Sequence, residues 1–79
     1  MTLEERVTQN LRAARKQRKL SQEMVAQRAG VSVSYISMLE RGRRSPPLET
    51  IEVLAKALGI QPIALLGDLS RSKLGARRS

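Results

Sequence analysis

A chain of 79 residues with fifteen Lys and Arg, seven Asp and Glu and a formal charge of +8 is expected to form one small basic domain, without room for a separate sensor or catalytic domain. It contains neither Cys nor His, which excludes disulfides, thiolate metal sites and imidazole acid–base chemistry. We therefore expect no metal, no cofactor and no enzymatic activity. No apolar run approaches the roughly 20 residues of a membrane span, and residues 1–20 are charged throughout, so we expect a cytoplasmic protein with no membrane association.

The basic charge favours a polyanionic partner. Eleven of the fifteen basic residues are Arg, whose planar guanidinium forms paired hydrogen bonds with phosphates and guanine edges. Tyr35 is the single aromatic residue, which argues against the single-strand binders that stack bases on aromatic rings. Double-stranded DNA is the expected polyanion, and a merely solvated cationic surface is the alternative.

A first amphipathic helix is expected near the N-terminus, capped by Thr2. Its apolar residues recur with helical spacing at Leu3, Val7, Leu11 and Ala14. The basic turn at residues 15–19 suits the negative end of the helix dipole and is equally suited to face phosphates.

Residues 21–42 predict two short helices joined by a tight turn. Gln22 to Ala29 carries apolar residues on one helical face, and Gly30 follows directly, where a left-handed backbone usually ends a helix. Ser32 is then placed to cap a second helix that begins at Val33. Two helices joined in this way form a geometry that lets the second one enter a DNA major groove.

The remaining sequence predicts two more helices and a tail. A loop with two Arg and two Pro precedes a fourth helix that begins at Pro47 or Leu48 and ends at Gly59. A short fifth helix is expected from about Pro62. The composition then turns basic and polar, so we expect a domain over residues 1–69 and a disordered basic tail over residues 70–79. No alternating strand pattern occurs, and the predicted class is all-α.

The spacing of these elements resembles that of a known family. The matching residues are Gln22, Ala26, Gly30, Val31, Ser32, Ile36, Leu39, Glu40 and Gly42. With the later P.LETI…LA.ALGI segment, they resemble the phage-repressor and Cro-like (XRE-type) helix-turn-helix family of bacterial transcription regulators over residues 7–66. The resemblance implies a compact five-helix bundle of the lambda-repressor-like type. It also implies binding to a near-palindromic operator as a two-fold homodimer.

The resemblance makes the helix from Val33 the recognition helix. If Ile36 and Leu39 face inward, the residues left to contact bases are Ser32, Val33, Ser34, Ser37 and Met38. Ser can donate to or accept from base edges, and Val can touch a thymine methyl. This face departs from many family members because it has no Arg, Gln or Asn for bidentate recognition. Specificity is therefore expected to depend also on DNA shape, water bridges and the neighbouring loop.

Phosphate contacts are expected from Gln22, Tyr35, Arg43 and Arg44. Tyr35 could pack its ring on the fold and reach a phosphate with its hydroxyl, and the alternative is a partly buried Tyr with a purely structural role. For the two Arg the alternative is plain surface charge. The resemblance also implies that Glu40 pairs with Arg15, which would neutralise a carboxylate that otherwise repels phosphates. We interpret that pair as structural.

The apolar residues near the end of the domain suggest a dimer interface. They are Ile60, Ile63, Leu65, Leu66 and Leu69, more than a short terminal helix needs for its own packing. The alternative is that all of them complete the small core.

The leading hypothesis is a sequence-specific regulator of transcription, acting as a repressor, with no small-molecule ligand evident. A regulator of the antitoxin or restriction–modification controller kind would use the same mechanism. A rival of another class is an adaptor module with the same fold, whose affinity for nucleic acid is not sequence-specific.

Overall fold

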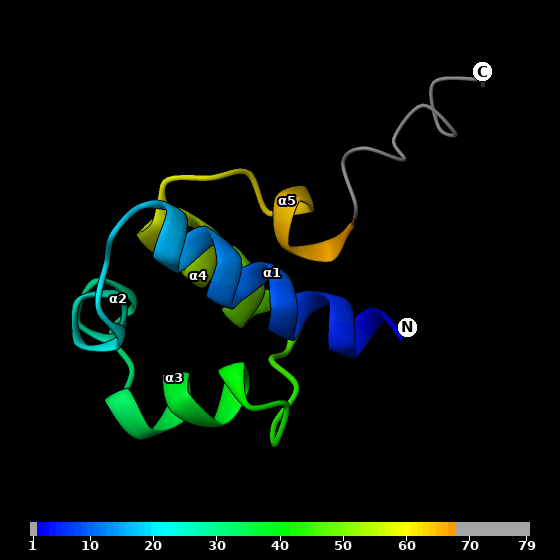
Figure 1. The fold of residues 1–79 in the computed structure, drawn as a ribbon, viewed down its shortest axis with the longest axis horizontal. Coiled ribbons are helices and arrows are strands. Elements are labelled where there is room, and N and C mark those ends of the chain that lie inside the picture. The colour runs from blue at the N-terminus through cyan, green and yellow to red at the C-terminus, as the bar shows by residue number, and fades with distance from the viewer. Residues whose placement is uncertain (1, 68–79) are drawn as a thin grey trace.

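The computed structural model describes residues 2–67. Within this range it is all-α, with five helices: α1 (Leu3–Gln17), α2 (Gln22–Ala29), α3 (Val33–Glu40), α4 (Leu48–Leu58) and α5 (Ile63–Leu66) (Figure 1). The predicted class and helix order are confirmed. None of the helices in the described range is long and apolar enough to cross a membrane. The expected tail at residues 70–79 and the domain boundary at residue 69 lie outside the described residues.

Hydroxyl side chains fix the starts of the first three helices. Thr2 and Glu5 form a reciprocal capping box at α1, in which the Thr2 Oγ1 accepts from the Glu5 N–H at 3.1 Å. Ser21 Oγ accepts from the Met24 N–H, and Ser32 Oγ from the Tyr35 N–H, both at 3.0 Å. Each cap satisfies an N–H that has no partner within its own helix.

Residues with a left-handed backbone conformation set the directions in which the chain leaves its helices. Gly30 has φ 74°, and the Val31 N–H donates to the Ala26 oxygen at 3.0 Å, which turns the chain from α2 toward α3. The same kind of turn ends α1, but there Lys19 adopts φ 59°. Lys19 is the one non-glycine residue with positive φ in the described range.

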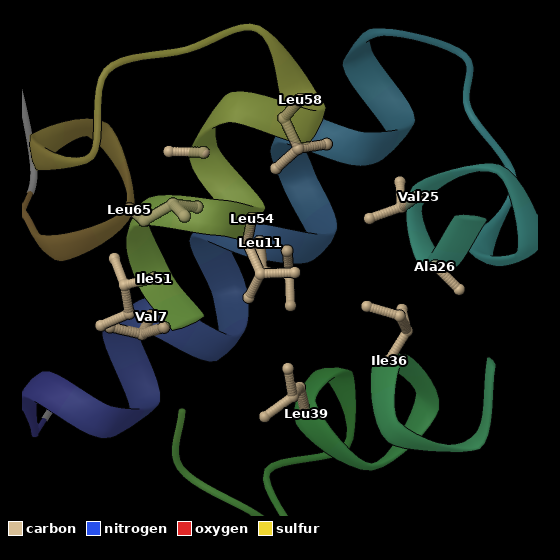
Figure 2. Close-up of a cluster of buried hydrophobic side chains, with 11 residues drawn as sticks. Val7, Leu11, Val25, Ala26, Ile36, Leu39, Ile51, Leu54, Leu58 and Leu65 are labelled. Atoms are coloured by element: carbon tan, nitrogen blue, oxygen red, sulfur yellow. The ribbon is translucent and has the colours of Figure 1, made fainter. Parts of the chain in front are cut away.

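The core lies between all five helices. Figure 2 shows Leu11 of α1 and Leu54 of α4 close together, with Ile36 and Leu39 pointing toward them from α3. Its buried members are Val7, Leu11, Val25, Ala26, Ile36, Leu39, Ile51, Leu54, Ala55, Leu58 and Leu65. The inward orientation of α3 is thus set by two residues spaced three apart, and its other face is left to solvent.

The first residues of α1 and α4 are apolar but lie outside this core. Leu3 is 59% exposed and Leu48 is 73% exposed. Each lies one helical turn before the first buried residue of its helix, which is Val7 in α1 and Ile51 in α4. The apolar residues of both helices therefore begin one turn before the region covered by packing partners.

Candidate nucleic-acid interface

Helix α3 separates core residues from surface residues along its length. Ile36 and Leu39 are fully or almost fully buried. On the other face, Val33 is 40% exposed, Ser34 is exposed, and Ser37 and Met38 are half-buried. The candidate base-contacting residues of α3 therefore keep accessible surface in the folded monomer.

Ser32 precedes this face at the start of α3. It is exposed, but its Oγ already accepts the Tyr35 N–H in the helix cap. The hydroxyl hydrogen remains free to donate, because the cap uses Oγ only as an acceptor. In a base contact Ser32 could therefore donate its O–H or accept at the second lone pair of Oγ.

The predicted ion pair between Arg15 and Glu40 is present behind α3. Arg15 Nε donates to Glu40 Oε2 at 2.6 Å, and Nη2 donates to Oε1 at 3.0 Å. The pair is largely shielded from solvent, with side-chain exposures of 13% for Arg15 and 4% for Glu40. Two parallel hydrogen bonds make this the geometrically specific form of an Arg–carboxylate contact.

Arg15 also joins the ion pair to the loop between α1 and α2. Its Nη1 donates to the Leu20 carbonyl at 2.8 Å. The hydrogen bond and charge of Glu40 raise the pKa of Arg15, against the opposing effect of burial. The guanidinium therefore stays charged and neutralises Glu40 close to a surface that is otherwise basic.

Gln22 takes part in the same network, which the sequence did not reveal. Its Nε2 donates to Glu40 Oε1 at 3.1 Å. One side-chain N–H thus has a protein partner, and one remains for the phosphate contact expected of this residue. The network connects α1, α2 and α3, since its members come from these three helices.

A shallow depression of about 300 Å³ lies over this network. Its lining residues are Arg12, Arg15, Gln22, Ser37, Glu40 and Arg41. Arg12 and Arg41 are exposed and were not selected from the sequence as site residues. A signal for Arg12 was available, because it lies three residues before Arg15 and therefore on the same side of α1.

The loop after α3 carries the other expected phosphate-contacting arginines. Gly42 has φ 74°, and its turn is closed by the Arg43 N–H donating to the Met38 oxygen at 2.9 Å. The Arg44 guanidinium carbon then lies 5.8 Å from the centre of the Tyr35 ring. That ring is half-buried and packs against the core, and the phosphate contact expected of its hydroxyl stays a prediction.

The surface around α3 is positively charged. The Arg15–Glu40 contact is the single ion pair among the described residues. Arg12, Arg41, Arg43 and Arg44 are exposed, and none of them is paired with a described carboxylate. Their guanidinium groups are available to an anion.

The expected dimer interface requires a correction. Leu65 is fully buried in the core of the monomer and offers no surface to a second copy. In contrast, Ile63 is 63% exposed, and Ile60 and Leu66 are half-buried. Leu69 lies outside the described residues.

Asn10 holds α5 in place against α1. Its Nδ2 donates to the carbonyls of Leu65 and Gly67, both at 3.0 Å. These contacts span more than 50 positions of sequence, so local spacing could not have indicated them.

Comparison with known proteins agrees with this geometry. The sequence model of the helix-turn-helix family matches residues 11–65. The chain belongs to the helix-turn-helix family. In this helix-turn-helix protein, α2 and α3 are the two helices that give the family its name.

Similar proteins include regulators from phage and bacteria. The chain is 47% identical over 62 residues to the immunity repressor protein of Bacillus phage phi105, covering 78% of this chain and 43% of the repressor. It is 38% identical over 77 residues to the uncharacterized HTH-type transcriptional regulator y4dJ of Sinorhizobium fredii (strain NBRC 101917 / NGR234), covering 98% of this chain and all of the relative. The chain thus spans less than half of one relative and the full length of the other.

A solved structure is also similar. The restriction-modification controller protein C.AhdI from Aeromonas hydrophila superposes with a TM-score of 0.73 at 42% sequence identity. The match covers 76% of this chain and 91% of the controller.

Proposed function

We propose that this protein is a sequence-specific double-stranded DNA-binding regulator of transcription, acting as a repressor. The observation that carries the proposal is the exposed face of α3, flanked by four arginines that have no carboxylate partner among the described residues. The similarity to the phage immunity repressor and to the HTH-type transcriptional regulator supports the same conclusion. It acts in the cytoplasm, without a cofactor and without catalysis.

In the proposed complex, α3 enters the major groove and the arginines hold the phosphates on either side. Val33, Ser34, Ser37 and Met38 face the base edges. Gln22 uses its free N–H at the start of α2, where the helix dipole also favours a phosphate. Repression follows from occupancy of the operator.

The regulator is proposed to bind as a homodimer through α5. Ile63 is the most exposed residue of the remaining interface set, which also contains Ile60 and Leu66. Two recognition helices must be about 34 Å apart to enter successive major grooves on one face of the duplex. A two-fold contact is the simplest way to fix such a distance, and it matches a near-palindromic site.

The test is selection of duplexes from a pool with a randomised window, followed by titration of the selected duplex at two salt concentrations. A dimer that neutralises six to ten phosphates should lose about 10³–10⁵ in affinity between roughly 50 and 200 mM salt. It should still prefer the selected duplex over an unselected one. Equal affinity for both duplexes would contradict the proposal and would favour the adaptor function.

A second candidate is a controller of restriction–modification genes. The observation that favours it is the 42% identity with C.AhdI over most of that protein. The mechanism at the DNA is the same in both cases. Mapping the selected site onto the source genome separates them, because a controller should bind next to restriction and modification genes.

A further inference from the structure

Arg44 lies closer to the start of α3 than its place in the sequence suggests. It follows the end of α3, yet its guanidinium carbon is 5.8 Å from the centre of the ring of Tyr35, which belongs to the first turn of the helix. Tyr35 and the helix end at Glu40 are about 7–8 Å apart along the axis, given a rise of 1.5 Å per residue. The side chains of Arg44 and Tyr35 therefore span this distance between them.

The protein fixes both partners of this contact. The Tyr35 N–H is held by the Ser32 cap, and the ring packs against the core. The loop that carries Arg44 is held by the turn at Gly42 and by the bond from Arg43 to Met38. A guanidinium within about 6 Å of an aromatic centroid is attracted by the ring face. Arg44 is thus oriented before any DNA arrives.

The base-facing side of α3 carries no guanidinium group. Val33, Ser34, Ser37 and Met38 cannot form the paired hydrogen bonds with which Arg distinguishes guanine by its O6 and N7 atoms. Arg44 carries such a group and is held beside the first turn of α3. That turn belongs to the part of a recognition helix that enters the groove most deeply.

We infer that Arg44 contacts a guanine next to the bases covered by α3, and that Tyr35 is a positioning residue that acts through its ring. The inference rests on the proposed function and refines it, because it narrows the loop's expected part in specificity to Arg44 and gives this residue a guanine in place of a phosphate. It also gives Tyr35 a role that does not need its hydroxyl group. Tyr35→Phe should keep this role, and Tyr35→Leu should lose it.

The first experiment measures the contact without DNA. The Arg44 Nε–Hε signal in NMR spectra should show a ring-current shift in the wild type and in Tyr35→Phe, and the shift should disappear in Tyr35→Leu. Thermal unfolding of each variant checks that the fold is intact. An Arg44 signal that is the same in Tyr35→Leu as in the wild type would overturn the positioning role.

The second experiment repeats the duplex selection with variants. Arg44→Ala should lose the preference for guanine at one position of each half-site, with discrimination reduced about 5- to 150-fold. Arg43→Ala removes the same charge from the neighbouring position and should weaken all duplexes without losing that guanine. If Arg44→Ala selects the same guanine as the wild type, the guanine contact is wrong.

The third experiment is a double-mutant cycle on the selected duplex. Tyr35→Leu should weaken binding about 2- to 5-fold, which corresponds to an exposed cation–π contact, and it should have no further effect when Arg44 is already Ala. A similar loss in both backgrounds would show that Tyr35 acts independently of Arg44. A wild type that prefers no duplex would instead contradict the proposed function itself, and the guanine contact with it.

Discussion

Glu40 is an acid placed close to a surface that is proposed to meet phosphates. Its side chain is 4% exposed and receives hydrogen bonds from Arg15 and Gln22. Partners of this kind offset the desolvation of a buried carboxylate, and removing one leaves a charge without compensation. The network should therefore contribute to stability before it contributes to recognition.

Glu40→Ala should lower the free energy of unfolding. The expected loss is about 2–3 kcal/mol, between the values for exposed and fully buried ion pairs, because Arg15 loses its charged partner while it remains shielded from solvent. Chemical denaturation of the two proteins measures the difference. Glu52→Ala, an exposed acid on α4, is the matched control and should change stability by less than about 0.5 kcal/mol. Equal stabilities of wild type and Glu40→Ala would contradict the structural role of the pair.

The contribution of the Arg15 charge should not vary across the neutral pH range. Its pKa is raised in the folded state by the hydrogen bond with Glu40. A raised pKa contributes stability that is fully present below the ordinary pKa and is lost only as pH rises through the folded value. Both values lie far above neutrality. A difference in the effect of Glu40→Ala between neutral and mildly alkaline pH would therefore require another titrating group.

At the residue scale, the sequence predicted the partners of some side chains and not others. Glu40 and Arg15 were paired through the family resemblance, and the structure contains that pair. The bond from Gln22 to Glu40 was not foreseen, because an amide carries no spacing pattern that indicates its partner. Leu65 and Ile63 were grouped together as interface residues, although one is fully buried and the other is mostly exposed. In a helix of four residues, periodicity is too short to separate the two faces.

At the scale of a single helix, the end of α1 contains an unusual residue. Lys19 has φ 59°, and the Leu20 N–H donates to the Arg15 oxygen at 3.1 Å across the turn. A left-handed conformation is unfavourable for a residue with a Cβ atom. The turn that orients α2 relative to α1 is therefore formed at some cost in stability.

Lys19→Gly should stabilise the protein by about 0.5–1 kcal/mol, because the relief of left-handed strain exceeds the entropy that Gly loses on folding. Thermal unfolding measures the change. Lys16→Gly removes the same charge from the last helical turn of α1, where Gly is a poor helix former, and should destabilise by a similar amount. The prediction fails if both substitutions shift stability in the same direction.

Helix positions were predictable because their signals are local. Hydroxyl caps at Thr2 and Ser32, together with Gly30, define the helix ends in the sequence as they do in the structure. The approach of the Arg44 side chain to the Tyr35 ring had no such signal. It depends on the turn at Gly42 and on the packing of the Tyr35 ring against the core.

At the scale of the whole molecule, the two proposed interfaces are well separated. Figure 1 shows α3 along one edge and α5 on the other side of α1. Contact through α5 would leave the face of α3 free for DNA. The proposed dimer and the proposed DNA complex are therefore compatible in one assembly.

Ile63→Glu should convert the proposed dimer into a folded monomer. Ile63 is 63% exposed in the single chain, so the substitution leaves the core intact but removes about 1.5–3 kcal/mol of apolar burial per protomer from the interface. Sedimentation equilibrium measures the oligomeric state. Met24→Glu is the control, since Met24 is also partly exposed at 42% but belongs to α2, and it should remain dimeric. A wild type that sediments as a monomer would contradict the proposed interface.

The division of α3 into two faces has a consequence for how such a regulator can change. Ile36 and Leu39 bind the helix to the core, whereas Val33 and Ser34 point to solvent. Substitutions on the outer face therefore leave folding almost untouched. After gene duplication, a copy could acquire a new operator through a few codon changes, and the two copies could then control separate genes without interfering with one another.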